Sequence, residues 1–111
     1  MKKREVLNVL SALANEARLD VFRLLVRAGV EGVAAGVIGE RLGIPAATLS
    51  FHLKELKNAG AVTVRREGRS LIYSPDFDAM GGLVEFLSKN CCQGIEVKAC
   101  CVPQPRAGAP S

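Results

Sequence analysis

Residues 43–62, GIPAATLSFHLKELKNAGAV, constrain the fold more than any other stretch of this chain. Pro45 suits the first turn of a helix, where its missing N–H costs nothing, and Gly60 suits the position just past a helix end. We therefore predict a helix over residues 46–58. Three leucines at helical spacing give it one apolar stripe for a core, namely Leu49, Leu53 and Leu56.

The opposite face of this predicted helix is small, hydroxylated and basic. It carries Ala47, Ser50, Phe51 and Lys54. Such a face fits a DNA major groove, where a hydroxyl reaches base edges or phosphates and a phenyl ring meets a thymine methyl. The alternative interpretation of the same pattern is an ordinary surface helix in contact with solvent.

Helical periodicity also precedes this segment. We predict helices over residues 4–14, 16–28 and 33–42. The expected apolar face of the first helix is Val6, Leu10 and Leu13. Asn15 is the expected N-cap of the second helix and Gly29 its end. Because only Gly43-Ile44-Pro45 separates the third helix from the helix over 46–58, the two predict a helix-turn-helix.

After Gly60 the apolar period changes from 3.6 to 2, which predicts a β-hairpin over residues 61–73 interrupted at Glu67-Gly68-Arg69. Three arginines are expected near its tip: Arg65, Arg66 and Arg69. They could clasp DNA phosphates or enter a minor groove, or they could simply be solvated charges. The neighbouring helix-turn-helix favours phosphate contact.

A last helix is expected to open at Ser74-Pro75-Asp76 and to run to about residue 90. Its apolar face consists of Phe77, Met80, Leu83, Val84 and Leu87. Few other elements remain to cover this face, so we assign it, with the first helix, to a homodimer interface. This order of helices and strands along the chain predicts a mainly α winged helix-turn-helix with a two-stranded β wing.

We expect three parts: a DNA-binding and dimerisation domain over 1–90, a cysteine-bearing sensor segment over 91–101 and a disordered proline-rich tail over 102–111. The net charge of +4 is a mild indication of a polyanionic partner. No nucleophile-plus-base pair or glycine-rich phosphate loop suggests an enzyme.

Neither a membrane span nor a secretory signal is expected. No stretch approaches the ~18 apolar residues that a span requires, and Asn8 and Ser11 interrupt the apolar run near the N-terminus. We therefore expect a cytoplasmic protein without a membrane partner. In that reducing compartment the four cysteines imply ligands or redox chemistry rather than structural disulfides.

The chain resembles the ArsR/SmtB family of metalloregulatory repressors. The resemblance rests on ALANEARLDVFRLL at 12–25, LSFHLKELKNAGAVTVRREGR at 49–69 and NCCQG at 90–94. It implies a dimer that leaves double-stranded operator DNA when a metal or thiophilic ion binds. By matched position it places DNA contacts at Ala47, Thr48, Ser50 and Phe51. Pro45-Ala46 and Phe51 depart from common family residues, so the operator sequence cannot be inherited.

His52 is the only histidine of the chain and lies about a sixth of a turn from the leucine stripe. We expect it to be half buried, and to pack or contact a phosphate rather than bind a metal. Family sites with histidines on the last helix, or with cysteines on the helix before the recognition helix, have no counterpart here. The C-terminal cysteines therefore remain as the candidate sensor.

These cysteines form two adjacent pairs, Cys91-Cys92 and Cys100-Cys101, with seven residues between them. A vicinal disulfide would be strained, because adjacent Cα atoms lie about 3.8 Å apart and a relaxed bridge needs roughly 4.4–6.8 Å. Zinc prefers cysteines about two to four residues apart. As(III) or Sb(III), soft ions that need only three thiolates, fit better.

We predict Cys91, Cys92 and Cys100 as the ligands of As(III), with Cys101 as the alternate third ligand. Relatives that end in NCC with a later cysteine respond to arsenite, so the resemblance points the same way. An organoarsenical is a further possible inducer. Two alternatives stay open: a Zn/Cd-sensing repressor, and a redox sensor in which oxidation joins the two pairs across the loop.

Overall fold

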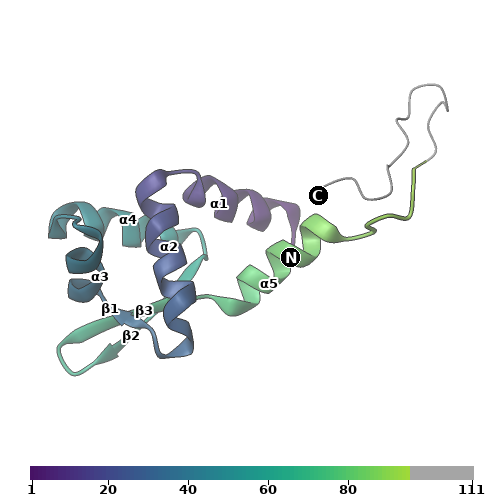
Figure 1. Ribbon diagram of the computed structural model, residues 1–111. Coiled ribbons are helices and arrows are strands. Elements are labelled where there is room, and N and C mark those ends of the chain that lie inside the picture. Colours follow the sequence, from purple (N-terminus) through teal and green to yellow (C-terminus); the bar gives the residue numbers. More distant parts are fainter. Residues whose placement is uncertain (96–111) are drawn as a thin grey trace.

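The structure is a computed structural model and describes residues 1–95 (Figure 1). The later cysteine pair and the predicted tail lie outside the described residues. The elements in order are α1 (Lys3–Leu13), α2 (Glu16–Ala28), the short 3-10 helix η1 (Gly29–Glu31), β1 (Val33–Ala34), α3 (Ala35–Leu42), α4 (Ala46–Asn58), β2 (Val62–Glu67), β3 (Ser70–Pro75) and α5 (Phe77–Ser88).

The helix ends follow from side-chain caps and glycines. The Asn15 side chain accepts a hydrogen bond from the Arg18 backbone N–H at 3.1 Å, which caps α2 as predicted. Gly43 is left-handed with φ +67°, so it ends α3 and turns the chain into α4 within three residues. The predicted helix-turn-helix is confirmed, and α4 has the predicted bounds.

The wing is the antiparallel hairpin β2–β3, in which Arg65 faces Ile72 and Glu67 faces Ser70. A third strand, β1, joins it to give the order β1-β3-β2. The prediction that residue 33 begins a helix is therefore wrong, because Val33 pairs with Tyr73. Two residues are too few to show alternation, and their partner lies far along the chain, so no local pattern indicates this strand.

The core gathers one face of each of α1–α4 against the start of the hairpin. Its buried members are Val9, Ala12, Val21, Leu25, Ile38, Leu49, Leu53, Leu56, Ala61 and Val62. The leucine stripe of α4 is buried as predicted. In α1, however, the buried residues are Val6, Val9 and Ala12, whereas Leu10 is exposed. Leu13 is partly buried and packs against the core as predicted, so the predicted apolar face of α1 is wrong at Leu10 and omitted Val9 and Ala12.

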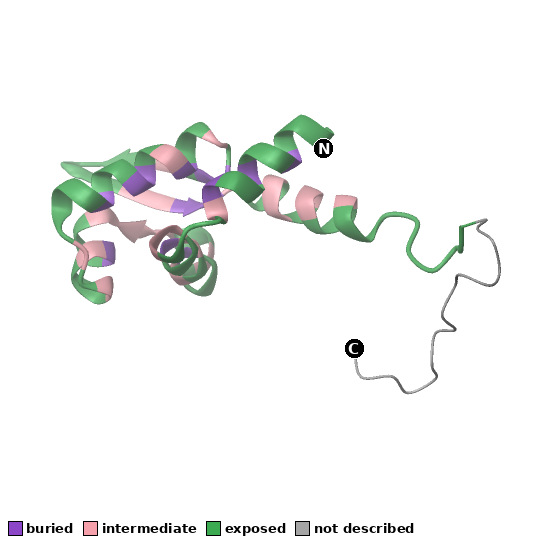
Figure 2. Cartoon of the chain, turned by 90° about the horizontal axis from the view of Figure 1, so that it is seen from above, coloured by how far each residue is buried: buried purple, intermediate pink, exposed green. Residues whose placement is uncertain are grey.

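Helix α5 leaves the wing and lies beside the start of α1, away from the rest of the body (Figure 1). None of its residues is buried, and Figure 2 shows only intermediate and exposed positions along it. It ends at Ser88, before the predicted residue 90, since Lys89 leaves the helical conformation with φ −58° and ψ 135°. No helix within residues 1–95 is long and apolar enough to cross a membrane.

Candidate nucleic-acid interface and thiol pair

Helix α4 presents to solvent the face that the sequence assigned to DNA. Its exposed residues include Ala47, Thr48, Ser50, Phe51 and Lys54. Close packing of α3 and α4 fixes the angle of this face, because a Cβ at Gly39 would lie 3.1 Å from the Ile44 carbonyl oxygen. A hydroxylated and basic helix face is therefore held rigidly at the surface, although its contacts with DNA remain a prediction.

Phe51 and His52, neighbours on α4, differ in their surroundings. Phe51 is 53% exposed, whereas His52 is only 9% exposed. Arg18 of α2 donates from Nε to Nδ1 of His52 at 3.2 Å, and its guanidinium carbon lies 5.5 Å from the centre of the Phe51 ring. His52 is thus more buried than predicted and packs inside the domain. Arg18 was missed because its partners lie 34 residues away along the chain.

The three wing arginines fall into two groups. Arg65 lies on the strand, opposite Ile72, and not at the tip as expected. Its Nη2 donates to the Glu31 carbonyl oxygen at 2.7 Å, and its Nε donates to Glu67 Oε2 at 2.7 Å. Because this guanidinium already has partners, its main structural effect is to fasten β2 to η1.

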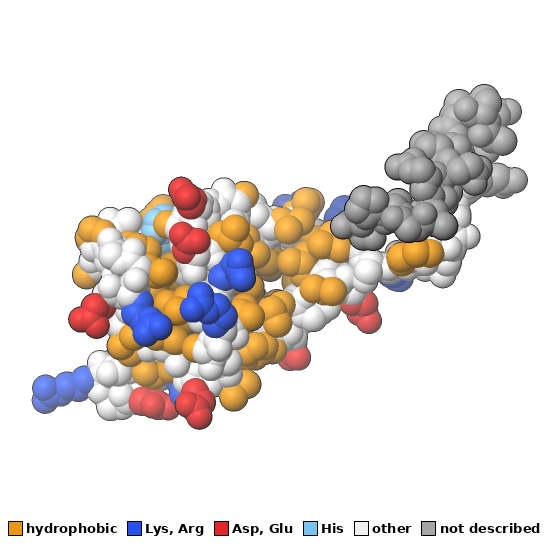
Figure 3. Space-filling model, in the orientation of Figure 1, with side chains coloured by type: hydrophobic (Ala, Val, Ile, Leu, Met, Phe, Trp, Pro, Cys, Tyr) orange, Lys and Arg blue, Asp and Glu red, His pale blue; other side chains and the backbone are white. Residues whose placement is uncertain are grey.

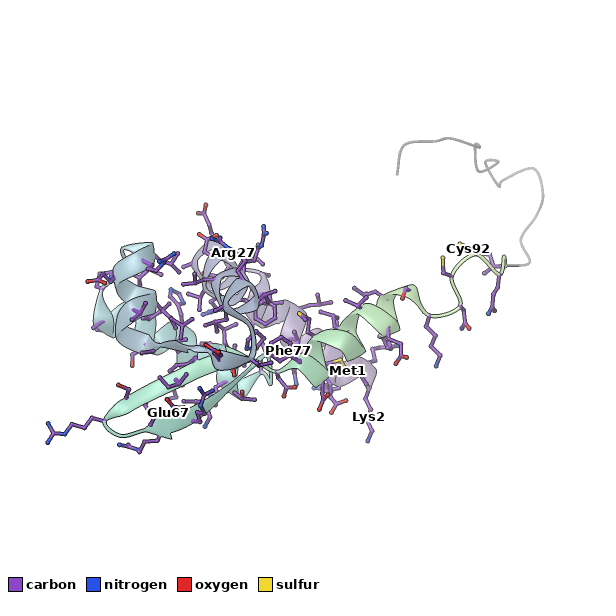
Figure 4. The ribbon with its side chains drawn as sticks, turned by 60° about the horizontal axis from the view of Figure 1, so that its bottom comes forward. Met1, Lys2, Arg27, Glu67, Phe77 and Cys92 are labelled. Carbon is purple, nitrogen blue, oxygen red and sulfur yellow. The ribbon has the colours of Figure 1, made fainter. Side chains whose placement is uncertain are left out.

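Arg66 and Arg69 are exposed near the turn of the wing, and neither makes an ion pair within the described part of the chain. Figure 3 shows a basic side chain that projects from the wing tip, and Figure 4 shows Glu67 at the same end of the hairpin. A free guanidinium on a projecting hairpin suits a phosphate contact. Within the described residues these two arginine side chains have no ion-pair partner, whereas Arg65 has two protein partners.

A cleft of about 430 Å³ separates the helix-turn-helix from the wing. Its floor is mainly apolar, and Ser50 and Tyr73 lie among its lining residues. The cleft lies between α4 and β3, which is the second strand of the wing. The two proposed DNA-contacting elements, α4 and the wing, are therefore separate on the surface and packed on the same core.

Cys91 and Cys92 lie in the turn directly after α5, and both are free and exposed. The Cys91 backbone N–H donates to the Ser88 carbonyl oxygen at 2.9 Å, which ties the turn to the last helical residue. Figure 4 shows Cys92 beyond the end of α5 and away from the body. The thiol pair is thus placed directly at the end of α5.

The two thiols interact with each other. The side-chain hydrogen bond with Cys92, followed by the charge of its thiolate, raises the pKa of Cys91 above the ordinary value. No group of three potential ligands among His, Cys, Asp and Glu forms within residues 1–95. The predicted third ligand, Cys100 with Cys101 as its alternate, lies outside the described residues.

Comparison with known proteins identifies the class. The family described as "Helix-turn-helix domain" matches residues 13–65. The uncharacterised HTH-type transcriptional regulator YbzH of Bacillus subtilis is 32% identical over an alignment of 95 residues, with 75% of this chain and 95% of YbzH covered. The chain belongs to the helix-turn-helix transcriptional regulators.

A second relative, the nodulation protein NolR of Rhizobium meliloti, is 34% identical over 79 residues and matches 71% of this chain. The regulator spans 62% of the length of NolR. It likewise spans 61% of the length of YceK of Bacillus subtilis, an uncharacterised HTH-type regulator.

Solved structures confirm the winged helix-turn-helix fold. HlyU from Vibrio cholerae aligns with a TM-score of 0.65 and 28% identity over 84% of this regulator and all of the HlyU chain. Mb0332 from Mycobacterium bovis aligns with a TM-score of 0.63 and 28% identity over 82% and 94% of the two chains. The latter is described as a homodimeric winged helix-turn-helix DNA-binding domain and a possible ArsR-family regulator. The fold implied by the resemblance to ArsR-type regulators is thus confirmed, and the solved structures similar to this chain include a possible ArsR-family regulator.

Proposed function

We propose that this regulator is a homodimeric repressor that binds operator DNA and releases it when As(III), or a related trivalent metalloid, binds its C-terminal cysteine thiolates. The observation that carries the proposal is the exposed face of α4 next to a wing with two free arginines. Ser50, Phe51 and Lys54 offer base and phosphate contacts, and Arg66 and Arg69 offer phosphate contacts.

Uncovered apolar surface on α1 and α5 supports the homodimer. Leu7 is 54% exposed, Val84 61% and Leu87 64%, although α1 and α5 lie beside each other in one chain (Figure 1). A second copy would bury this surface, and a two-fold dimer presents two α4 helices to one DNA duplex. The operator should then be an inverted repeat whose half-site centres lie about 34 Å apart, or a multiple of that spacing.

The chemistry of the thiol pair supports a metalloid inducer. Cys91 and Cys92 are free, exposed and adjacent in the chain, so together they could supply two of the three thiolates that As(III) takes. Cys100 would supply the third, with Cys101 as the alternate. Four-thiolate Zn(II) binding fits less well, because adjacent cysteines do not leave the loop that usually wraps zinc.

The place of the thiol pair supports coupling to DNA. Cys91 is hydrogen-bonded to the last residue of α5, and α5 belongs to the proposed dimer interface. Closure of the segment between the two cysteine pairs around an ion would pull on α5 and change the separation of the two recognition helices. Coupling free energies of about 1–3 kcal/mol, or roughly 5- to 150-fold in affinity, are typical of such linkage.

A titration on labelled DNA tests this proposal against its redox alternative. A duplex selected by the protein from a random pool is bound, and release is followed by fluorescence anisotropy. We expect micromolar arsenite and antimonite to release the DNA, and Zn(II), Cd(II) or peroxide at equal occupancy to leave it bound. Release by peroxide with no response to arsenite would establish the redox sensor instead.

A further inference from the structure

Arg18 joins α2 to the recognition helix through two different contacts. Its Nε donates to Nδ1 of His52 at 3.2 Å, and its guanidinium carbon lies 5.5 Å from the centre of the Phe51 ring. The Phe51 and His52 rings lie 5.7 Å apart with an interplanar angle of 58°. One guanidinium therefore contacts both a buried side chain and an exposed side chain of α4.

We propose that Arg18 is a positioning residue that orients the Phe51 ring for contact with a thymine methyl, and so sets a base preference of the regulator. The inference rests on the proposed DNA-binding function and deepens it. Phe51 is 53% exposed on the face of α4 that we assign to the major groove. No other aromatic side chain lies on that face of α4.

The physical argument concerns the freedom of an exposed ring. A phenyl side chain at a solvated helix position can exchange between rotamers, and ordering it on DNA costs free energy. A cation above the ring face favours one orientation, by roughly two- to fivefold at exposed sites. The ring is then preorganised before the DNA arrives.

His52 fixes the cation itself. Arg18 has no acidic partner within 4 Å among the described residues, and its hydrogen bond to the buried imidazole holds the guanidinium in place. The bond requires Nδ1 of His52 to be an acceptor, so the imidazole carries its proton on Nε2. The chain of contacts runs from a buried histidine, through Arg18, to the exposed ring.

A competing role for Arg18 is direct contact with a phosphate, because it is partly exposed and keeps unused N–H donors. The two roles make different predictions. A phosphate contact weakens all sequences alike when it is removed, and it reduces the slope of log K against log salt. A positioning role acts only through Phe51 and changes base preference, with the salt slope unaltered.

A double-mutant cycle on a selected duplex separates these roles. We expect Arg18→Ala to weaken binding by about two- to fivefold in the wild-type protein, and by less than about twofold when Phe51 is already replaced by Leu. Replacing thymine with uracil, which removes only the methyl group, should weaken wild-type binding and have a smaller effect on Arg18→Ala. Arg18→Lys should keep the charge and the salt slope but not restore the thymine preference.

Arg23→Ala is the matched control, because Arg23 lies on the same helix, is exposed and makes no hydrogen bond or ion pair with any described residue. Urea unfolding of each variant accounts for any loss of folded protein. Equal losses for Arg18→Ala in both backgrounds, with a reduced salt slope, would overturn the positioning role. If the wild-type protein selects and binds no duplex, the proposed function fails, and this inference fails with it.

Discussion

Gly32→Ala should be far more destabilising than Gly29→Ala, although both glycines lie in the same short connection. Gly32 has φ +78° and ψ 179°, and Gly29 has φ +83° and ψ −156°, a region that is open to glycine alone. A Cβ at Gly32 would lie 2.7 Å from Ile72 Cγ2 and 2.8 Å from the Tyr73 carbonyl oxygen. A Cβ at Gly29 would meet nothing within 4 Å.

The two variants share the backbone strain, so the difference between their free energies of unfolding measures the steric effect of the close approach of Gly32 to β3. Backbone strain costs each variant about 1–3 kcal/mol. At Gly32 the obstructing atoms include a backbone carbonyl that no side-chain rotation can move, which adds roughly 1–3 kcal/mol of overpacking. We therefore expect a free energy of unfolding lower by about 1–3 kcal/mol for Gly29→Ala and by about 2–6 kcal/mol for Gly32→Ala.

Urea unfolding at one fixed protein concentration measures this difference, since the stability of a dimer depends on concentration. The two variants should have the same m-value, and the urea concentration at the unfolding midpoint should be lower for Gly32→Ala than for Gly29→Ala. DNA affinity should also fall more for Gly32→Ala, because β1 fastens the wing to the helix-turn-helix. Equal midpoints for the two variants would refute the approach of Gly32 to β3.

Three further predictions concern the wing, the dimer and the thiols. Arg69→Ala should weaken binding to all duplexes alike and reduce the slope of log K against log salt by about 1.8, because the dimer loses two phosphate contacts; an unchanged slope would remove Arg69 from the interface. Leu87→Glu should yield monomers in sedimentation velocity, whereas Val30→Glu, at an exposed position outside α1 and α5, should leave the dimer intact. Cys92→Ala should return the pKa of Cys91 towards its ordinary value, so iodoacetamide should alkylate Cys91 faster at neutral pH; an unaltered rate would show that the two thiols do not interact.

Those parts of the fold that depend on local periodicity could be predicted from the sequence. The leucine stripe and flanking Pro45 and Gly60 locate α4 to the residue, and the change of period after Gly60 locates the hairpin. The strand β1 could not be predicted, because a two-residue strand is specified by its distant partner in β3. Similarly, α1 is apolar on two sides, so its pattern does not reveal which side faces the core.

Some features of the candidate site could likewise be predicted from the sequence, and others could not. The exposed face of α4 follows directly from the helical period, and the adjacency of Cys91 and Cys92 is visible in the chain itself. Arg18 and Arg65 each have a hydrogen-bond partner 34 residues away in sequence, His52 and Glu31, which is beyond any local pattern. Only the folded chain reveals these long-range contacts of the two arginines.

In the proposed mechanism, metalloid binding at the thiols and operator binding oppose each other through α5. Thermodynamic linkage makes this testable: the affinity for a selected duplex is measured with and without arsenite, and the affinity for arsenite with and without the duplex. We expect the same reduction in both directions, about 5- to 150-fold, and no reduction in Cys91→Ser, which should keep its affinity for DNA. A Cys91→Ser protein that arsenite still releases from DNA, or a wild-type protein that binds arsenite equally well with and without DNA, would exclude this coupling.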